Sequence, residues 1–234
     1  MTQPFRTHHL YRSRLWDDIL IEHKSDYVAI TSKNTLDTVS SAVWRGGFSR
    51  ATTFVNWKVP LDYDSNDPGQ MMNKQLLEWG YQPAQTVGLM TAAKLSHAAV
   101  TEEYGDAFRL VCCTTAGTGN AARAGRVART YSAYELGTIN TVVLIDGRMS
   151  QAAMINAVMT AVEAKAAALQ DAGVHDQSGE IATGTTSDAI VIGVSQGSFA
   201  ETHAFAGTAT TLGDAIARHV YQTVLEAVVT QKED

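Results

Sequence analysis

Short runs of β-branched and aromatic residues recur through the chain and predict β-strands. Between them, clusters of glycine and polar residues predict tight turns, as in RGGF at 45–48. The predicted strands are residues 26–31, 38–43, 51–59, 86–91, 97–101, 108–114, 140–145 and 189–194.

A helical spacing of apolar residues replaces this pattern at 150–172, which Ser150 can cap and Gly173 can end. We expect its apolar stripe to form the buried face. The stripe consists of Ile155, Val158, Met159, Val162, Ala166 and Leu169.

A second long helix is predicted from Thr211, because Asp214 three residues on gives an arrangement like a capping box. A shorter helix is predicted at 70–79. On the second long helix the apolar residues repeat at every fourth position, as Ile216, Val220, Val224 and Val228.

The order of these elements is neither regular strand–helix alternation nor all-β. It predicts an α+β fold with mixed, largely antiparallel sheets layered with a few long helices, of which a helix–sheet–sheet–helix sandwich is one version. A chain of 234 residues is long for one domain and short for two. We therefore expect a single domain over 1–234, with residues 1–25 as an N-terminal extension or arm.

Composition narrows the function classes. A net charge of −6 argues against a nucleic-acid surface, and we expect no membrane attachment because apolar runs are short. The basic start, MTQPFRTHHLYRSR, has no apolar core behind it, so no secretory signal is expected. Cys112 and Cys113 are adjacent and poorly placed to bridge, which favours buried thiols and a cytoplasmic location.

The first candidate site is the loop TTAGTGNAA, which follows the strand predicted at 108–114. Gly117 and Gly119 match two glycines of a dinucleotide fingerprint, and Ala122 stands at the third position, but the surrounding strand–helix alternation is missing. A lysine of the phosphate-binding Walker loop is also missing. A backbone amide nest for an anion or oxyanion, and a simple turn that needs small residues, both stay open.

A second loop, ATGTTSDA at 182–189, places four hydroxyls and a carboxylate before a buried strand. Amide hydrolysis can use a hydroxyl nucleophile with a base and backbone donors, and both loops contain such groups. A capping role explains the second loop equally well. On the helix 150–172, Glu163 and Lys165 flank the apolar stripe on opposite sides and therefore cannot pair with each other.

No metal site is expected. The acidic segment 62–69 imitates a calcium loop, but Asp67 stands where the sixth position needs glycine and Asn73 where the twelfth needs glutamate. The seven histidines lack H-x-x-x-H spacing and cysteine partners at zinc spacing.

Many short motifs occur in one order from about Ser40 to the C-terminal helix. They are Ser40-Ser41-Ala42-Val43, Gly46-Gly47-Phe48, Asn56 before Val59, Asp62-Tyr63, Asp67-Pro68, Gly88-Leu89-Met90-Thr91-Ala92-Ala93, Thr115-Ala116-Gly117, Gly119-Asn120, Arg123-Ala124-Gly125, Gly137-Thr138-Ile139-Asn140, Glu163-Ala164-Lys165, Ala168-Leu169, Ala182-Thr183-Gly184-Thr185, Asp188-Ala189, Ala206-Gly207-Thr208-Ala209-Thr210 and Gly213. Together they resemble the adenosylcobinamide amidohydrolases, the CbiZ family of corrinoid salvage.

The resemblance implies hydrolysis of the amide that joins the aminopropanol arm to the corrin ring, giving adenosylcobyric acid and 1-aminopropan-2-ol. The substrate carries its own cobalt, so no protein cofactor is expected. The expected partner is a small-molecule corrinoid, and a homo-oligomer stays open. A corrinoid is a broad apolar disc edged with amides, which suits aromatic platforms. The candidates for these platforms are Trp44, Trp57, Tyr63, Trp79 and Tyr81.

On this hypothesis Glu163 is the general base, acting on water or on a hydroxyl of Thr114, Thr115 or Thr185. Backbone amides at 117–120 or 184–185 hold the oxyanion, and Lys165, Asn120 or Asn140 orients the substrate. The expected substrate-binding residues are Asn56, Thr91, Gly117, Gly119, Asn120, Arg123, Asn140, Thr183, Gly184 and Asp188.

Two alternatives remain. One is a non-catalytic corrinoid-binding or sensing protein on the same fold, and the other is a nucleotide-binding oxidoreductase that uses GTGNAA. The chain lacks D-x-H-x-x-G, so its sequence does not indicate a histidine that replaces the lower axial ligand.

Overall fold

A computed structural model of the chain describes residues 2–59, 67–126, 138–231 and 233. Short 3₁₀ turns lie at Pro4–Arg6, Pro83–Gln85 and Leu95–His97. The strands and α-helices of the described part follow in the order β1 (Leu10–Arg12), β2 (Ile19–His23), β3 (Tyr27–Ser40), β4 (Gly47–Lys58), α1 (Pro68–Glu78), β5 (Thr86–Thr91), β6 (Ala99–Gly105), β7 (Phe108–Ala116), β8 (Ile139–Asp146), β9 (Arg148–Met149), α2 (Gln151–Asp171), β10 (Ala189–Val194), β11 (Thr202–His203) and α3 (Thr211–Thr230).

Nine strands form one curled sheet in the order β1-β2-β3-β10-β8-β7-β6, with β4 paired to β3 and β5 paired to β4. Most neighbours are antiparallel, whereas β8 with β10 and β4 with β5 are parallel. β9 and β11 form a separate parallel pair. The predicted α+β class, with a largely antiparallel sheet and a few long helices, is confirmed.

Strand β3 joins two layers of this sheet. Residues 28–32 pair with β2, residues 37–40 pair with β10, and the register against β4 shifts between Thr31 and Leu36. The sequence predicted two separate strands at 26–31 and 38–43, because the polar residues between them interrupt the apolar pattern. The structure instead runs one irregular strand through that interruption, and the irregularity lets the sheet divide.

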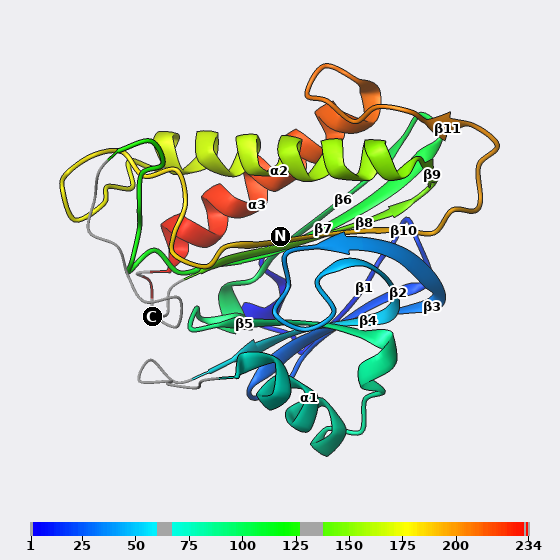
Figure 1. Cartoon of the computed structure of the whole chain (residues 1–234), viewed down its shortest axis with the longest axis horizontal. Helices are drawn as coiled ribbons and strands as arrows, with labels where there is room; N and C mark the ends of the chain where they lie inside the picture. Colours follow the sequence, from blue (N-terminus) through cyan, green and yellow to red (C-terminus); the bar gives the residue numbers. More distant parts are fainter. Residues whose placement is uncertain (1, 60–66, 127–137, 232, 234) are drawn as a thin grey trace.

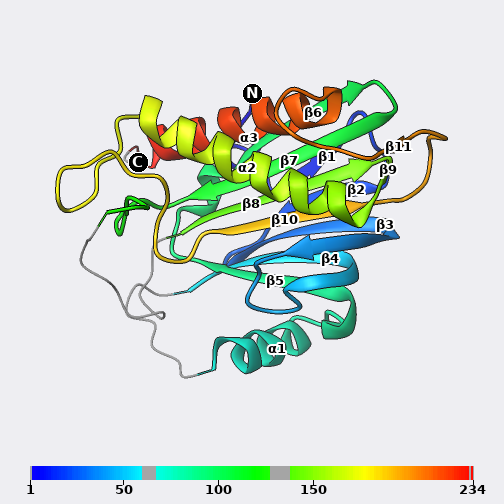
Figure 2. The same ribbon diagram turned by 45° about the horizontal axis from the view of Figure 1, so that its top comes forward.

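The layers follow one another as helices, strands, strands and helix (Figures 1 and 2). A first core lies between the pair α2 and α3 and the strands β6, β7, β8 and β10. A second core fills the space between these strands and the layer formed by β1 to β5. Helix α1 packs on the outer face of β3 and β4 through Met72 and Leu76.

Adjacent side chains of β7 pack into different cores, because successive residues of a strand point to opposite faces. Cys112 belongs to the first core and Cys113 to the second, and both thiols are free and buried. The prediction of buried, unbridged thiols is therefore confirmed. Burial raises the pKa of Cys112 to about 11 and also raises the pKa of Cys113.

The prediction of the buried face of α2 is wrong for half of its stripe, although Leu169 is fully buried and Val158 packs against the core. Ile155, Met159 and Val162 are 48%, 55% and 42% exposed, whereas the face that packs on the core is built mainly of alanines. Burying alanine removes little apolar surface from water, so the larger residues dominated the hydrophobic pattern of the sequence. Small residues nevertheless suit a helix that packs closely against both α3 and the strands. The predicted ends are confirmed, with Ala153 N donating to Ser150 Oγ and Gly173 at φ 63°.

By length and composition α2 could cross a membrane, although half of its most apolar window is buried inside the protein. Its packing in the first core accounts for that apolar character.

Helix α3 buries the predicted stripe of Ile216, Val220, Val224 and Val228. Its cap lies one residue earlier than expected, since Gly213 N donates to Thr210 Oγ1 at 3.0 Å.

The N-terminal segment is built into the sheet rather than forming an arm. β1 pairs with β2 and β2 with β3, and Ile19 and Ile21 are fully buried in the second core. These strands were missed because β1 is only 3 residues long and β2 is only 5, which gives little periodic pattern to detect.

Candidate active site

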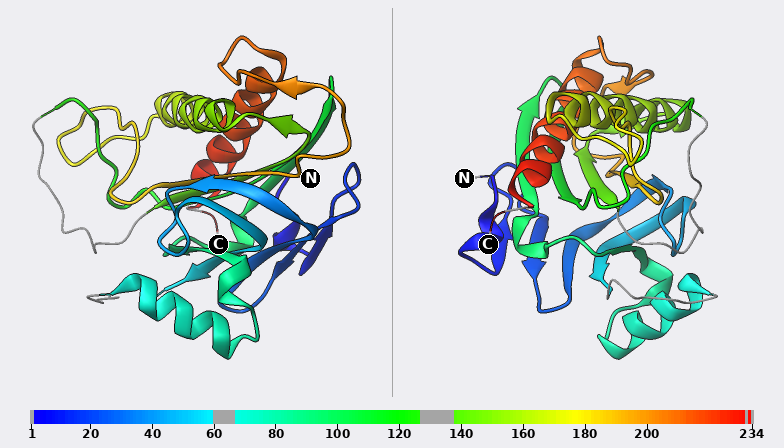
Figure 3. Two further views of the ribbon diagram at one scale, coloured as in Figure 1. Left: turned by 45° about the vertical axis from the view of Figure 1, so that its right-hand side comes forward. Right: turned by 90° about the vertical axis from the view of Figure 1, so that its left-hand side faces the viewer.

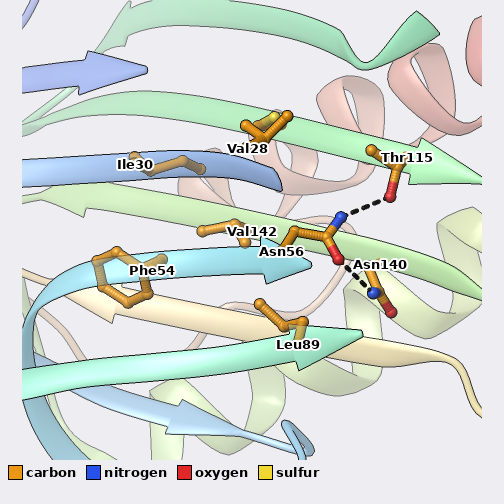
Figure 4. Close-up of a pocket in the computed structure, with 9 residues that line it drawn as sticks. Val28, Ile30, Phe54, Asn56, Leu89, Thr115, Asn140 and Val142 are labelled. Atoms are coloured by element: carbon orange, nitrogen blue, oxygen red, sulfur yellow. Dashed lines mark hydrogen bonds between the residues drawn. The ribbon is translucent and has the colours of Figure 1, made fainter. Parts of the chain in front are cut away.

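Three buried polar side chains meet between the two strand layers, near the ends of β4 and β7 and the start of β8. Asn56 Nδ2 donates to Thr115 Oγ1 at 2.7 Å, and Asn140 Nδ2 donates to Asn56 Oδ1 at 2.8 Å (Figure 4). Asn140 Nδ2 also reaches the carbonyl of Met90 at 2.7 Å. We call Asn56, Thr115 and Asn140 the amide–hydroxyl trio.

The trio closes one side of a small pocket that is otherwise apolar. Its other walls include Phe54, Leu89 and Val142 (Figure 4). The free space is about 10 Å³, room for about one water molecule. The pocket is therefore too small for a substrate, and the trio is better suited to ordering the strand ends than to holding a large ligand.

A second polar group lies where α2 faces the start of β10. Lys165 Nζ pairs with Asp188 Oδ2, and both side chains are nearly buried. Thr185 Oγ1 donates to Asp188 Oδ1 at 2.5 Å, and Thr185 N donates to Oδ2 at 3.0 Å. A hydroxyl thus donates to a carboxylate whose other oxygen is held by a lysine, and a hydroxyl next to such a base is one requirement of nucleophilic catalysis.

Thr138 connects these two polar groups. Its hydroxyl lies 2.8 Å from the carbonyl of Ser187 and 3.1 Å from Asn140 Oδ1. The next residue, Ile139, donates its amide to Asp188 Oδ1 at 2.9 Å. The start of β8 therefore connects Asp188 to the trio through a continuous set of hydrogen bonds.

The two glycine-rich loops lie side by side beyond the end of α2 (Figure 3). Ala122 N donates to the carbonyl of Gly184 at 2.9 Å, and Thr183 N donates to the carbonyl of Ala122 at 2.9 Å. Arg123 Nη1 and Ala124 N add bonds to Ile181 O and Thr183 Oγ1, at 2.7 and 2.9 Å. The predicted proximity of the loops therefore rests on residues 122–124 and 181–184.

An open bowl of about 530 Å³ lies over this junction. Its walls are residues 122–124 and 183–188, together with Val162, Lys165 and Ala166 of α2. Its volume is within the range of small-molecule sites. The Thr185–Asp188–Lys165 group thus faces a space that a substrate can enter.

The two loops differ in whether their backbone amides are already hydrogen-bonded. The amides of Gly184 and Thr185 are bonded to Ala122 O and Asp188 Oδ2, so they are not free to hold an oxyanion. Gly117 N is bonded to Thr138 O. Within the described part of the chain, the amides of residues 118–120 have no bonded acceptor, so they are the better oxyanion donors.

Asn120 is 5% exposed, and neither amide atom of its side chain has a hydrogen-bond partner among the residues that the structure describes. Buried polar groups are normally paired, so this carboxamide is available to bond a ligand. This observation agrees with the prediction of Asn120 as a substrate-binding residue, a role that remains a proposal.

Glu163 lies apart from these groups. Its exposed carboxylate accepts from Thr208 Oγ1 at 3.0 Å and does not line the bowl. On the same flank of α2, Asn156 and Thr160 bond to the backbone of Ala206. This flank therefore holds the 206–208 loop. Asp188, rather than Glu163, contacts a candidate nucleophile, and the role of Glu163 as general base stays a prediction.

The remaining predicted residues have local roles. Thr91 is fully buried at the end of β5, where its hydroxyl accepts from Ala93 N at 3.0 Å. Gly119 has open space around its Cα, so close backbone approach does not explain it. Asp67 of the acidic segment caps α1, and residues 60–66 lie outside the described residues.

The predicted aromatic platforms pack against each other. Trp79 lies 4.0 Å from Tyr27 and 5.6 Å from Trp57, measured between ring centroids. With Trp44 and Tyr81 they join the cluster between α1 and the sheet. Tyr63 lies outside the described residues. These four predicted platforms are thus largely engaged in packing.

The dinucleotide interpretation of GTGNAA is not supported. Such a fingerprint opens a helix whose N-terminus holds the phosphates, whereas residues 117–126 form turns and a bridge. A dinucleotide site also needs a free acidic residue for the ribose, whereas Asp146 at the end of β8 is bound by Arg109 at 2.9 Å and by Ser195 at 2.7 Å.

Sequence reasoning missed Thr138 as a site residue. It stands in the motif Gly137-Thr138-Ile139-Asn140, but a hydroxyl just before a strand is common, and only the contacts to Ser187 and Asn140 distinguish it.

Comparison with known proteins identifies relatives of this chain by sequence. A family profile described as adenosylcobinamide amidohydrolase (CbiZ) matches residues 13–234. The adenosylcobinamide amidohydrolase of Methanosarcina mazei is 29% identical over 161 residues, which cover 68% of this chain and 70% of that protein. The enzyme of the same name from Halobacterium salinarum is 29% identical over 191 residues, 79% of this chain and 77% of that protein.

An uncharacterised protein of Methanocaldococcus jannaschii is 28% identical over 208 residues, covering 80% of each chain. All three similarities extend over most of both partners.

Proposed function

We propose, from the premise that this chain belongs to the adenosylcobinamide amidohydrolase (CbiZ) family, that it cleaves the amide between the aminopropanol arm and the corrin ring of adenosylcobinamide. Water is consumed, the C–N bond breaks, and the products are adenosylcobyric acid and 1-aminopropan-2-ol. This reaction would return a scavenged corrinoid to cobalamin synthesis. The observation that carries the proposal is the Thr185–Asp188–Lys165 group facing the bowl.

In this mechanism Asp188 is the general base and Thr185 the nucleophile. Asp188 takes the Thr185 hydroxyl proton as Oγ1 attacks the amide carbon, and Lys165 holds the other carboxylate oxygen in place. The amides of residues 118–120 stabilise the oxyanion. The proton passes to the departing nitrogen, and water then hydrolyses the ester on Thr185 to release the carboxylate.

Substrate positioning is assigned to the neighbouring loops. The unpaired carboxamide of Asn120 would bond an amide at the edge of the corrin ring. The trio, linked through Thr138, would hold the start of β8 and therefore Asp188 in register. This role of the trio and Thr138 would explain why the family motifs include residues that do not line the bowl.

The proposal is tested by incubating the protein with adenosylcobinamide and measuring both products by mass spectrometry. We expect a mass of adenosylcobyric acid and an equal amount of 1-aminopropan-2-ol. A transient increase in the mass of the protein, absent in Thr185→Val, would support the ester on Thr185. A spectral change of the corrinoid on mixing, with no aminopropanol released, would overturn the proposal in favour of a binding or sensing protein.

A further inference from the structure

A second cavity lies next to the paired loops, and its lining includes Thr118 and Gly119 of the loop that supplies the proposed oxyanion donors. It has a volume of about 550 Å³ and lies between the loop after β7, the C-terminal end of α2 and the last turns of α3. Its walls include Gly119, Ala172, Val174, His175, Val228 and Val229. None of its lining residues is Asp, Glu, Lys or Arg, so it suits an uncharged, largely apolar surface.

His175 is an exposed residue that brings an imidazole to the lining of this cavity. Its ring Nδ1 lies 2.8 Å from the carbonyl oxygen of Gly173. A carbonyl can only accept, so Nδ1 carries the proton, and in the neutral ring Nε2 keeps its lone pair. Nε2 has no partner among the residues that the structure describes. Histidines that ligate metals are typically fixed in this way, with one nitrogen donating to a carbonyl and the other free to coordinate.

The backbone around His175 is also held in place. Val174 O accepts from Ala182 N at 2.8 Å, and Asp176 N donates to Glu180 O at 2.8 Å. His175 itself forms a bridge with Ile181. The imidazole is therefore carried by a closed hairpin, which lowers the entropy that a ligand would lose in ordering it.

This hairpin continues directly into the candidate active site. Its returning side leads from Ile181 and Ala182 to Thr183 and Gly184, which line the bowl. Gly119 of the cavity and Ala122 of the bowl lie in the same loop. The cavity and the bowl therefore lie against the same two loop segments.

We propose that His175 Nε2 is an axial ligand to the cobalt of the corrinoid substrate, whose flat face lies in this cavity. The inference rests on the proposed function, because it takes the substrate to be a corrinoid without a base of its own. Such a corrinoid leaves its lower axial position open to an added nitrogen ligand, and imidazole is a suitable donor for first-row transition metals. The aliphatic walls would cover the apolar face of the ring.

The test uses cob(II)inamide as the probe, bound to the protein under anaerobic conditions and studied by electron paramagnetic resonance. The unpaired electron of low-spin cobalt(II) points along the axial direction, so one axial nitrogen splits each cobalt line into a triplet. We expect this triplet in the wild-type protein and its loss in His175→Gln. The matched control is His8→Gln, which changes an exposed histidine elsewhere and should keep the triplet.

A wild-type experiment guards against misfolding of the variant. Protein labelled with nitrogen-15 histidine should convert the triplet into a doublet. Bound cob(II)inamide without nitrogen splitting, or a triplet that histidine labelling leaves unchanged, would overturn the assignment. Aminopropanol release by the same wild-type preparation tests the proposed function separately. Aminopropanol release without nitrogen splitting would overturn only the axial-ligand proposal. Absence of aminopropanol release would refute the proposed hydrolase activity.

Discussion

Asp188 and Lys165 form an ion pair in which the two side chains are only 11% and 7% exposed. The carboxylate also accepts bonds from Thr185 and Ile139, so it links α2, the 183–188 loop and β8. Because a buried charge is costly without its partner, the pair has both a structural and a chemical role.

Asp188→Asn is expected to lower the kcat for aminopropanol release by roughly 10²- to 10⁴-fold, because the general base is lost. It should also lower the free energy of unfolding by about 3–5 kcal/mol, since Lys165 is left unpaired. The double variant Asp188→Leu with Lys165→Met should recover part of the stability without recovering activity. Steady-state kinetics and urea denaturation measure the two effects. A wild-type kcat in Asp188→Asn would exclude the residue as base.

Glu163→Gln is the matched control on the same helix. Its carboxylate is exposed and bonds Thr208, so we expect kcat to stay within about a factor of two and the free energy of unfolding to change by at most about 0.5 kcal/mol. If this variant lost as much kcat as Asp188→Asn, the base would be Glu163 after all.

Thr115→Val should destabilise the fold by about 1–3 kcal/mol, because it leaves the Nδ2 donor of buried Asn56 without its acceptor. Thr115→Ser keeps the hydroxyl and should retain most of that stability. Urea denaturation of both variants checks the expectation. A larger loss in Thr115→Ser than in Thr115→Val would show that the methyl group, rather than the hydrogen bond, matters.

Gly184→Ala should impair catalysis. A Cβ at this position would lie 2.6 Å from Asp188 Oδ2 and 2.9 Å from Lys165 Nζ, so the ion pair must shift. We expect at least a roughly tenfold fall in kcat, in the range of lost general-base catalysis. Gly197→Ala is the control, because the nearest atoms to its added Cβ lie 3.9 Å away and the residue does not line the bowl. A smaller effect at Gly184 than at Gly197 would contradict the expected shift of the ion pair.

Glu103 predicts a pH dependence of stability. The hydrogen bond from Arg218 lowers the pKa of the Glu103 carboxyl, and a bond from His219 adds to this shift. Because the folded pKa lies below the unfolded one, the stabilisation is complete above the unfolded pKa of about 4.3 and is lost as pH falls through the folded value. Glu103→Gln should therefore cost about 1 kcal/mol near neutral pH and progressively less in acid. Urea denaturation of both proteins near neutral pH and in acid measures this difference in the free energy of unfolding. An equal difference under the two conditions would refute the prediction.

Much of the fold could be predicted from the sequence where local pattern and tertiary packing agree. The α3 stripe and the Ser150 cap are such cases. The face of α2 could not be predicted, because burying Ala157 and Ala161 depends on how closely α3 and the strands approach, not on the hydrophobicity of the residues themselves. Division of the sheet at β3 depends on long-range pairing with β2 and β10 in the same way.

The candidate site shows the same limit. Residue type together with the family resemblance selected Lys165, Thr185 and Asp188, and helical spacing excluded pairing of Glu163 with Lys165. They could not show that Asp188 contacts Lys165 while Glu163 contacts Thr208, because both carboxylates are chemically equivalent in the sequence. Thr138 was missed for a related reason, since its partners come from a distant loop.

The adjacent thiols of β7 offer a consequence for the dynamics of the molecule. An alkylating reagent can reach Cys112 only when the helices lift from the strands, and Cys113 only when the two strand layers separate. The raised pKa values keep each thiol unreactive until such an opening occurs. In variants that keep only one of the two cysteines, the rate of alkylation would therefore report how often the corresponding layer opens.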